Sequence, residues 1–405
     1  MSRILYIQYT NPAGYPPLEH SSRILADAGW QVLFLGTGAL GANDLQFPPH
    51  PRIRVKQLPF CPAGLRQKFH YISFCLWVLG WAIRWRPKWV YASDLLACPP
   101  ALSLGMLLRR HLIYHEHDSP NTESRSAFLR FCLAARRRCA RSARCCILPN
   151  QNRARQFSAE TRPASPALVV WNCPSRTEVV PSPRRENGHG LRLLYHGSIV
   201  PERLPLTVIE ALAKLPDNVI LRIIGYETVG SSGYLGALRL TALRLGIANR
   251  IDLIGTLQRR AEILEVCRDS DVGLALLPHA AHDRNIQAMT GASNKPFDYL
   301  ACGVPVLVSD LPDWHDMFVG QGFGLGCDPS DPASIATAIQ RYYDAPAEMR
   351  AMGERGRQRV IDEWNYEWQF RGVRAILDTT ARKLAVENEN ARVQVKPQTH
   401  LKSEL

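Results

Sequence analysis

Short apolar segments alternate with segments of helical periodicity along most of the chain. Runs of Val, Ile, Leu and aromatic residues predict buried strands, and apolar residues spaced three and four apart predict helices. The predicted strands lie at 3–10, 30–36, 52–59, 89–93, 111–117, 144–149, 167–172, 192–198, 219–225, 251–256, 272–278, 305–310 and 323–327. The predicted helices lie at 17–28, 68–85, 95–109, 124–142, 151–158, 205–214, 231–246, 260–269, 296–302, 332–343 and 346–363. Continuous apolar strands that alternate with helices indicate parallel sheets covered on both faces.

The alternation is interrupted by one segment without periodicity that is rich in Pro, Arg, Gly and Ser. It reads PSRTEVVPSPRRENGHG and has the composition of a linker. We therefore expect an α/β protein with two doubly wound, Rossmann-like domains that face each other across a cleft. The predicted parts are an N-terminal domain at 1–175, a linker at 176–190, a C-terminal domain at 191–365, a helix crossing back to the N-terminal domain at 366–385, and a disordered tail at 386–405.

The stretch ASNKPFDYLACG, residues 292–303, leads from a small polar loop into a predicted helix. A loop that enters a helix presents free N–H groups and the positive end of the helix dipole, which together favour an anion. Ser293 and Asn294 occupy cap positions, and Lys295 adds a positive charge suited to phosphate. Asp298, in the first turn, is placed to accept hydrogen bonds from ribose hydroxyls. Plain helix capping without a ligand explains the same residues.

Glycines follow three other predicted strands. In YHGSIVPERLP, Gly197 and Ser198 end a strand, and Arg203 lies shortly after them. A glycine lets the backbone approach a phosphate, and an arginine suits a diphosphate by charge and by geometry. An ordinary turn with a surface arginine is the alternative. Gly225 ends the next strand and is a weak signal alone. Gly14 lies in the loop after the first strand, in a sequence that lacks the dinucleotide-binding GxGxxG pattern.

The sequence YHEHDSP ends the fifth predicted strand with several titratable residues. His115, Glu116, His117 and Asp118 are candidates to hold a proton or a hydroxyl group at the cleft. Strand alternation places His115 and His117 on the same face. A zinc site would need further ligands at suitable spacing, and no such run is present in the sequence. We therefore expect no metal site.

Taken together, three blocks of the sequence resemble GT-B glycosyltransferases of the retaining family-4 type. They are YHGSIVPERLP, NKPFDYLACGVPVLVSD, and the ending GLGCDPSDPASIATAI, MGERGRQRV and EWNYEWQF. The resemblance covers about 192–375 strongly, and the N-terminal domain through the strand order and YHEHD. It implies that the C-terminal domain holds a nucleoside diphosphate sugar and that the N-terminal domain holds the acceptor. Such enzymes need no metal, because cations and a helix dipole stabilise the leaving diphosphate.

The resemblance also implies roles for donor-binding residues. Arg203 matches the second member of a basic pair that binds the diphosphate, and the first member falls on Ser198. We infer that Lys295 supplies the missing charge. The carboxylate that binds ribose in the family falls on Asp298, where glutamate is usual. The family's first motif glutamate falls on Thr290, a departure that leaves open how the donor sugar is gripped, although the backbone of the MTGASN loop is placed to cradle it.

On the acceptor side, the histidine of the family best matches His117, followed by Asp118, with His115 as the alternative. The bond to be broken joins an anomeric carbon to a phosphate oxygen, so negative charge develops on the leaving diphosphate. Arg203 and Lys295 are the side chains expected to stabilise that charge. Attack from the face of the leaving group would then give retention.

Overall composition is that of an ordinary soluble protein, with 46% hydrophobic and 21% charged residues. No uninterrupted apolar stretch is long enough for a membrane-spanning helix, and the N-terminus reads as a buried strand and lacks a signal-peptide pattern. These features predict a cytoplasmic protein. The eleven cysteines form no CxxC pair, so we expect reduced, mostly buried thiols in preference to disulfides or zinc ligands.

Charge is distributed unevenly between the two halves. Residues 1–180 contain 23 Lys and Arg against 9 Asp and Glu, whereas the remainder is almost balanced. Residues 69–89 contain four tryptophans, and residues 125–146 contain seven arginines among Phe and Leu. Such segments are typical of helices at an anionic membrane surface, or of core helices with a solvated arginine face. No nucleic-acid-binding module is recognisable, so we do not expect a nucleic acid partner.

These observations favour a retaining hexosyltransferase that uses a nucleoside diphosphate sugar and needs no cofactor. The expected acceptor is a glycan or a polyprenyl-diphosphate-linked glycan in polysaccharide or envelope biosynthesis, at the inner face of the cell membrane. One alternative is a sugar-nucleotide epimerase of the same architecture, which would need carboxylates in the cleft. Another is a non-catalytic sugar-nucleotide or membrane adaptor, since Thr290 replaces a glutamate.

Overall fold

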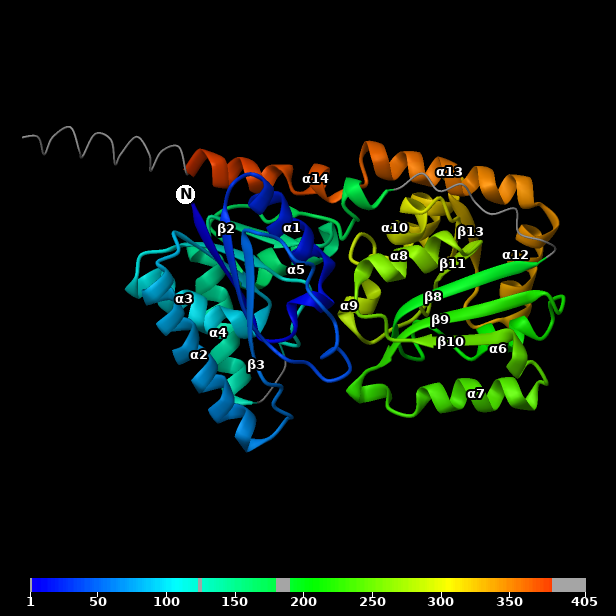
Figure 1. Ribbon diagram of the computed structural model, residues 1–405, viewed down its shortest axis with the longest axis horizontal. Coiled ribbons are helices and arrows are strands. Elements are labelled where there is room, and N and C mark those ends of the chain that lie inside the picture. The colour runs from blue at the N-terminus through cyan, green and yellow to red at the C-terminus, as the bar shows by residue number, and fades with distance from the viewer. Residues whose placement is uncertain (1, 123–125, 180–189, 381–405) are drawn as a thin grey trace, which may run out of the picture.

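The computed structural model describes residues 2–122, 126–179 and 190–380, which form two α/β domains side by side (Figure 1). The first sheet has seven strands in the order β3-β2-β1-β4-β5-β6-β7, and the second has six in the order β10-β9-β8-β11-β12-β13. All strand pairs within the two sheets are parallel. The prediction of two Rossmann-like domains is confirmed.

The strand bounds follow the apolar runs of the sequence closely. In the N-terminal domain they are β1 (Arg3–Gln8), β2 (Gln31–Thr37), β3 (Ile53–Leu58), β4 (Trp89–Ser93), β5 (His111–His115), β6 (Cys145–Leu148) and β7 (Leu168–Val169). In the C-terminal domain they are β8 (Leu191–Ile199), β9 (Val219–Glu227), β10 (Ile251–Gly255), β11 (Val272–Ala275), β12 (Val306–Ser309) and β13 (Gly324–Cys327). Most central strands are buried along their full length, as expected for strands with helices on both faces.

Helices cover both faces of each sheet. The N-terminal domain contains α1 (Pro16–Asp27), α2 (Leu65–Trp85), α3 (Cys98–Leu107), α4 (Ala127–Ser142) and α5 (Gln151–Thr161). The C-terminal domain contains α6 (Thr207–Leu212), α7 (Tyr234–Arg244), α8 (Arg260–Arg268), α9 (Arg284–Gln287), α10 (Lys295–Ala301), α11 (Pro312–Trp314), α12 (Pro332–Asp344) and α13 (Pro346–Asp362). Two of these, α9 and α11, were not predicted, because each is shorter than the window in which helical periodicity can be recognised.

The end of the described chain returns to the N-terminal domain. After α14 (Tyr366–Gln369), residues 371–380 are helical. Tyr366, Phe370 and Leu377 are buried against the N-terminal core, which includes Leu18 of α1. The predicted tail at 386–405 lies outside the described residues, as does most of the predicted linker. The first residues of the predicted linker, Arg176–Glu178, form a short 3-10 turn.

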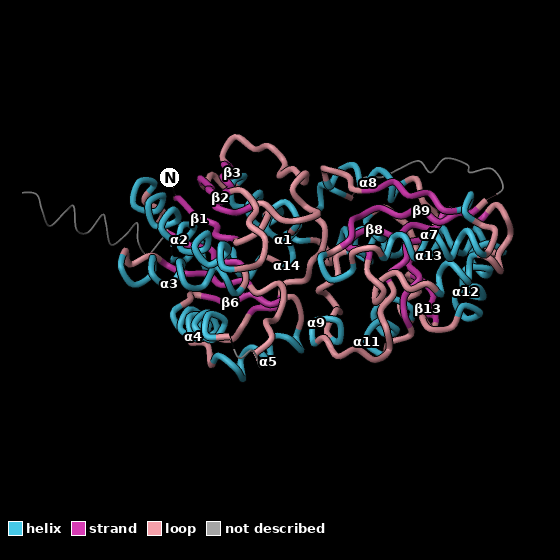
Figure 2. The backbone as a smooth tube through the Cα atoms, turned by 90° about the horizontal axis from the view of Figure 1, so that it is seen from below, coloured by secondary structure: helices cyan, strands magenta, loops and turns pink. Residues whose placement is uncertain are grey.

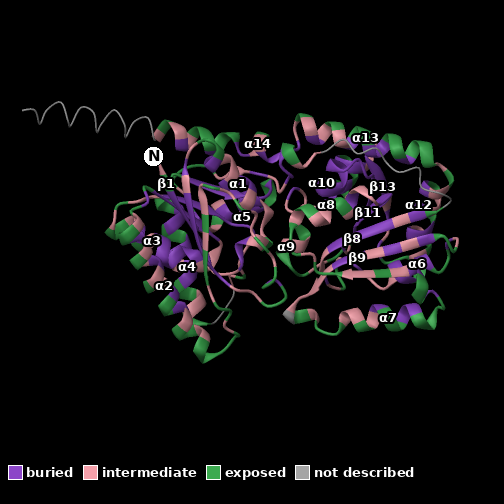
Figure 3. Ribbon diagram, in the orientation of Figure 1, coloured by how far each residue is buried: buried purple, intermediate pink, exposed green. Residues whose placement is uncertain are grey.

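The loops at the carboxyl ends of both sheets meet between the domains, and α9 of the C-terminal domain lies opposite α5 of the N-terminal domain (Figure 2). Buried residues concentrate along the strands, whereas the outer helices alternate between buried and exposed faces (Figure 3). The eleven cysteines are free thiols, and nine of them are buried. Among the helices that the structure describes, none is long and apolar enough to cross a membrane. The meeting of strand ends between the domains locates the candidate site.

Candidate active site between the two domains

A cavity of about 210 Å³ lies between the domains at the carboxyl ends of β8 and β9. Its lining includes seven residues predicted to bind the donor, namely Gly14, Gly197, Ser198, Arg203, Gly225, Asn294 and Lys295. Thr290, Ser293 and Asp298 were also predicted to bind the donor, and they are not among the residues that line it. The fold therefore brings together residues from the first loop of one domain and from three separate segments of the other.

Two glycines line this cavity at positions where a larger residue would clash. Gly197 has φ +117°, and a Cβ atom there would lie 2.8 Å from Nζ of Lys295. Gly225 has φ +147°, and a Cβ atom there would lie 1.8 Å from the carbonyl oxygen of Gly197. At Gly225 the clash is with backbone, so an L side chain cannot be accommodated without moving the strand ends. At Gly197 an L side chain would displace the Lys295 side chain and would also be strained by the positive φ. The backbone is consequently exposed to whatever fills the cavity.

Lys295 is the first residue of α10 and is only 7% exposed. Its Nζ lies 5.6 Å from the centroid of the Tyr195 ring. Burial and the nearby Arg203 guanidinium lower the pKa of Lys295 to about 7, and Asp298 opposes the shift. Among the ion pairs of the described residues, none involves Lys295 or Arg203. Two cations without a carboxylate partner in one cavity favour an anionic ligand.

Asp298 is fully buried behind the cavity wall, and its carboxylate is already hydrogen-bonded. It accepts from Arg260 at 2.6 and 3.1 Å and from the side-chain amide of Asn294 at 2.9 Å. Burial raises the pKa of Asp298, and Arg260 opposes that rise. The side chain of Asn294 therefore does not cap α10, contrary to the capping interpretation. The ribose-binding role of Asp298 stays a prediction, since its oxygens are turned toward Arg260.

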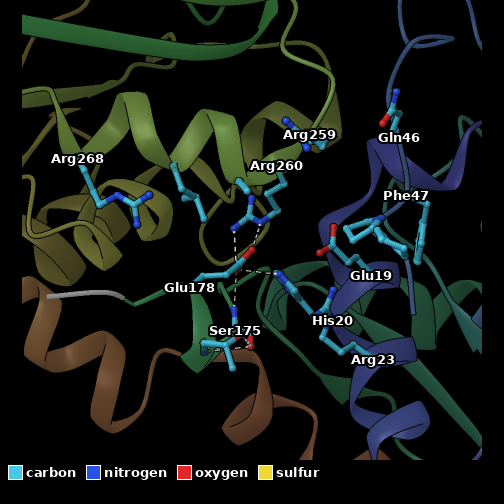
Figure 4. A pocket seen from close by; sticks show the side chains of 15 residues that line it. Glu19, His20, Arg23, Gln46, Phe47, Ser175, Glu178, Arg259, Arg260 and Arg268 are labelled. Atoms are coloured by element: carbon cyan, nitrogen blue, oxygen red, sulfur yellow. Dashed lines mark hydrogen bonds and ion pairs between the residues drawn. The ribbon is translucent and has the colours of Figure 1, made fainter. Parts of the chain in front are cut away.

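Arg260 extends this arrangement into an ionic network that lines a second cavity, of about 330 Å³ (Figure 4). Its guanidinium also donates to Glu178 at 2.6 and 3.2 Å, and His20 of α1 lies 3.0 Å from the same carboxylate. Burial acts to raise the pKa of Glu178, but Arg260 and His20 outweigh it and hold the pKa well below its usual value. The network links α10 and α8 of one domain to α1 of the other. Sequence reasoning missed it because its members are far apart in the chain.

In the N-terminal domain, His117 follows β5 and is 6% exposed. Its ring centroid lies 3.8 Å from that of His115 and 5.1 Å from that of Tyr15, so both histidines are on one face. Burial and the charge of Arg153 lower the pKa of His117 to about 3, so its imidazole is neutral. Both ring nitrogens of His117 are buried without a hydrogen-bond partner.

Asp118, by contrast, is exposed and lies 3.7 Å from the Arg153 guanidinium. Glu116 does not reach the cleft at all, contrary to the expectation from its sequence position. It is fully buried in the N-terminal domain, where Arg136 donates to it at 2.7 Å and Tyr114 at 2.6 Å. The reason is strand alternation, which sends Glu116 to the face opposite His115 and His117.

Asp94 is a candidate functional residue that sequence reasoning did not identify. It follows β4 with φ +64°, which is unusual for a residue other than glycine. Its carboxylate accepts the main-chain N–H of His117 at 2.7 Å and the side-chain amide of Gln8 at 3.2 Å. Burial and the charge of Asp118 raise the pKa of Asp94 to about 7. One signal was available: Asp94 is the only acidic residue between positions 45 and 115.

Arg153 was also missed, although it connects the two domains directly. Its buried guanidinium donates to the carbonyl oxygens of Ala288 at 3.0 Å, Asn285 at 2.8 Å and His117 at 2.6 Å. Asn150, the N-cap of α5, donates to the same Ala288 carbonyl at 2.6 Å. Arg153 therefore fixes the His117 loop relative to the loop that follows α9.

The loop that carries Thr290 is anchored to the N-terminal domain as well. The backbone N–H of Asn172 donates to Gly291 at 2.8 Å, and its side chain donates to Ala292 at 2.6 Å. Gly291 has φ +74°, and a Cβ atom there would lie 2.5 Å from the ring of Trp171. The position where the family has its first motif glutamate thus lies in a loop shaped by contacts with the other domain.

The 210 Å³ cavity therefore has a cationic side, where Arg203 and Lys295 are suited to hold a diphosphate and to stabilise charge on it as it leaves. The predicted His117 and Asp118 are not among the residues that line this cavity, and neither is Asp94. The imidazole of His117 and the carboxyl group of Asp94 carry hydrogen-bonding atoms of the kind that bind sugar hydroxyls. Among the described residues, no group of three or more His, Cys, Asp or Glu is placed to hold a metal ion.

Comparison with protein families gives one match in each domain. Residues 18–173 match a family model described as a glycosyl transferase 4-like domain. Residues 208–376 match a family model described as glycosyl transferase-like. No curated protein shows significant sequence similarity to the chain. The two models together cover most of both α/β domains.

Several solved structures have the same two-domain fold. HepE from Anabaena, in complex with UDP and glucose, has a TM-score of 0.70 and 18% identity and covers 94% of this chain and 100% of its own. Sucrose-phosphate synthase from Thermosynechococcus elongatus has a TM-score of 0.67 and 16% identity, covering 96% and 100%. WaaG, a glycosyltransferase involved in lipopolysaccharide biosynthesis, has a TM-score of 0.63 and 14% identity, covering 92% and 99%. At these identities the likeness shows the fold.

Proposed function

The chain is a family-4-like glycosyltransferase of the GT-B fold, and we propose that it transfers a hexose from a nucleoside diphosphate sugar, with retention, to a glycan or lipid-linked acceptor. The observation that carries the proposal is the cavity in which Lys295 and Arg203 face glycine backbone without a carboxylate partner. The complexes of HepE with UDP and with UDP-glucose support a nucleotide sugar as the donor. The proposed setting is assembly of an envelope or secreted polysaccharide at the inner face of the cell membrane.

In the proposed donor complex, the diphosphate lies between Lys295 and Arg203 against the backbone of Gly197 and Ser198. The bond between the anomeric carbon and the phosphate oxygen breaks, and the electron pair moves onto the diphosphate. The two cations stabilise that charge, and they do so strongly because Lys295 is buried away from water. A bound diphosphate also returns the pKa of Lys295 toward its ordinary value, so the ammonium form predominates in the complex.

Retention is proposed to follow from attack on the same face that the diphosphate leaves. The oxygen of an acceptor hydroxyl forms the new bond to the anomeric carbon, and its proton passes to the departing phosphate oxygen. His117 is suited to orient the transferred sugar, because its neutral ring has two nitrogens without partners. Asp94 and Arg153 hold the main chain of His117 from two sides and are proposed to position it.

A thermal-shift panel tests the donor site. UDP, GDP, ADP and dTDP and their sugar conjugates are added to the wild type, to Lys295→Ala and to Lys214→Ala, an exposed lysine of the same domain that serves as a matched control. A ligand that binds only the folded state raises the melting temperature according to its affinity. We expect one nucleotide to stabilise the wild type and the control but not Lys295→Ala. Absence of any shift in the wild type would refute the donor site.

Product analysis separates the proposed reaction from the two alternatives. A glycosyltransferase releases nucleoside diphosphate in proportion to acceptor. An epimerase of the same architecture would convert one sugar nucleotide into another without acceptor, and a non-catalytic adaptor would bind the nucleotide without turnover. Thr290, in place of a glutamate, makes the adaptor outcome the more important one to test.

A further inference from the structure

Helix α2 is apolar on two opposite faces. Its inner face buries Tyr71, Phe74, Val78 and Ala82 in the N-terminal core. Its outer face carries the large apolar side chains of Leu65, Phe69, Ile72, Leu76 and Ile83, which are 56–74% exposed. With about 3.6 residues per turn, these five positions fall within a strip roughly 60° wide and about 27 Å long. We call them the outer strip of α2.

Apolar exposure is concentrated in this part of the molecule. Fourteen large hydrophobic residues are exposed in the described structure, and eight of them belong to α2 and its neighbours α3 and α4. Met106 and Leu107 are the last two residues of α3, and Phe131 lies on α4. The three helices pack side by side on one face of the N-terminal sheet (Figure 1). An exposed apolar surface of this extent marks an interaction site.

The charge around the outer strip is positive. Arg66, Lys68 and Arg84 flank the strip on α2, and the helix contains no acidic residue. The neighbouring α4 contains five arginines and no acidic residue. Arg136 is buried and paired with Glu116 and Glu160, so the other four, which are exposed, add to the positive charge. An apolar strip bordered by cations matches the boundary between acyl chains and anionic headgroups. An acidic protein surface would match the cations but would leave the exposed strip itself without a partner.

A cavity of about 430 Å³ opens at the N-terminal end of α2. Its lining includes Tyr9, Leu65, Lys68, Tyr71 and Phe128. Leu65 is part of the outer strip and Lys68 borders it, so the cavity begins where the strip ends. Lys68 supplies a charge at its edge, and the aromatic rings supply an apolar wall.

Two residues that line this cavity are close in the chain to residues on the proposed acceptor side. Tyr9 directly follows Gln8, whose side chain donates to Asp94, and Leu96 lies two residues beyond Asp94. Asp94 in turn holds the main chain of His117. The loops that follow β1 and β4 therefore both line this cavity and position the main chain of His117. The outer strip adjoins the cavity through Leu65.

We propose that the outer strip of α2 docks on an anionic bilayer and that the adjoining cavity admits an amphiphilic, lipid-linked acceptor from that bilayer. The inference rests on the proposed transferase function, which identifies the ligand of the cavity as an acceptor. It deepens that function by naming the docking surface and the entry site, and by choosing a lipid-linked acceptor over a free glycan. The apolar wall contacts the lipid portion, and Lys68 contacts an anionic group next to it.

Vesicle flotation tests the docking surface. The wild type, Phe69→Ser/Leu76→Ser on the outer strip, and Leu240→Ser/Leu243→Ser on α7 are mixed with phosphatidylglycerol-containing vesicles and with pure phosphatidylcholine vesicles. Leu240 and Leu243 are 57% and 65% exposed and serve as a matched control. We expect the wild type and the control to float with anionic vesicles only, and the strip variant to bind at least tenfold more weakly. Binding of the wild type should also weaken as salt rises.

Three results would overturn the docking proposal: no flotation of the wild type, equal loss in the strip variant and the control, or full binding by the strip variant. A second copy of the chain is the competing occupant. If sedimentation showed a wild-type dimer that the strip variant converts to a monomer, the strip would be a subunit interface and the proposal would be wrong.

A separate pair of assays distinguishes this proposal from the proposed function. The strip variant should retain the nucleotide-induced thermal shift of the wild type, because α2 and Lys295 belong to different domains. Its transfer to a vesicle-embedded polyprenyl-diphosphate glycan should fall at least tenfold, while transfer to a water-soluble acceptor glycan stays the same. Loss of the nucleotide shift in the wild type would refute the donor site and leave the flotation result intact. Equal rates on both acceptors in the strip variant would refute membrane delivery.

Discussion

Lys295 offers the sharpest prediction, because its pKa couples donor binding to pH. In the free protein, burial and Arg203 lower the pKa of Lys295 to about 7. A diphosphate bound beside the ammonium group favours the charged form, so its pKa in the complex returns toward the ordinary value of about 10.4. Binding above pH 7 must then take up a proton. Affinity for the donor is therefore full below about pH 7 and falls as pH rises.

The size of the effect follows from linkage. If the pKa of Lys295 moves from about 7 to about 10.4, affinity falls close to tenfold per pH unit above pH 7, or about a hundredfold by pH 9. The charge itself contributes about 1.5–3 kcal/mol through a charged hydrogen bond, which corresponds to about 10- to 150-fold in affinity. The full move from about 7 to about 10.4 would correspond to about 4.6 kcal/mol, so it is an upper limit. A charge contribution of about 1.5–3 kcal/mol raises the pKa by about 1 to 2 and gives a fall in affinity of roughly 10- to 60-fold by pH 9. Lys295→Ala should therefore bind at pH 7 about 10- to 150-fold more weakly.

Isothermal titration calorimetry with a nucleoside diphosphate sugar measures both quantities. The sugar conjugate is preferable to the free diphosphate, because its phosphates do not titrate in this range. Titrations at pH 6 to 9, repeated in buffers with different ionisation enthalpies, report affinity and proton uptake. We expect proton uptake near pH 8 in the wild type and in Lys214→Ala, and none in Lys295→Ala. Affinity that is independent of pH in the wild type, or unchanged in Lys295→Ala, would refute the reasoning.

Three further substitutions test the surrounding structure. Gly225→Ala should lower the free energy of unfolding by at least about 2 kcal/mol, because a positive φ and a backbone clash coincide at this position. Gly236→Ala, at a helical position with open space, should not lower it. Urea denaturation of the two variants measures both free energies. Arg153→Met should lower the free energy of unfolding by roughly 3 kcal/mol and reduce kcat, because three buried carbonyl oxygens lose their donor. Arg155→Met, at an exposed position of the same helix, is the control. Equal stability of the two variants would refute the role of Arg153 in joining the domains. Burial raises the pKa of Asp94 in the folded protein to about 7, so its contribution to stability falls as pH rises from 4 to 7. Asp94→Asn should flatten the dependence of the free energy of unfolding on pH, measured by urea denaturation. An unchanged dependence would contradict the raised pKa of Asp94.

The sequence was sufficient to predict the fold because the signal was local. Buried parallel strands require continuous apolar runs, and both sheets appear where those runs predicted them. The candidate cavity was partly predictable for the same reason. Gly197, Gly225 and Lys295 each lie at the end of a strand or the start of a helix, and in parallel sheets such ends gather on one side.

The parts that escaped prediction depend on partners distant in the chain. Arg260 binds Asp298 across 38 positions and Glu178 across 82, so nothing near Asp298 indicates that its carboxylate is buried. Arg153 donates to three backbone carbonyls that are distant in the chain, and backbone carbonyls carry no residue-specific pattern. The outer strip of α2 is a different case. Its period was visible, but an apolar run on both faces of one helix cannot be assigned to core or surface until the sheet position is known.

The most direct test of the central claim is nucleoside diphosphate release from a panel of UDP-, GDP-, ADP- and dTDP-sugars, with and without a polyprenyl-diphosphate-linked glycan in anionic vesicles. The account predicts that one donor yields nucleoside diphosphate only when acceptor is present, that the glycan gains one sugar, and that Lys295→Ala releases at least tenfold less. Binding of a donor without release under any acceptor condition, or conversion of the donor to an isomer without acceptor, would contradict it.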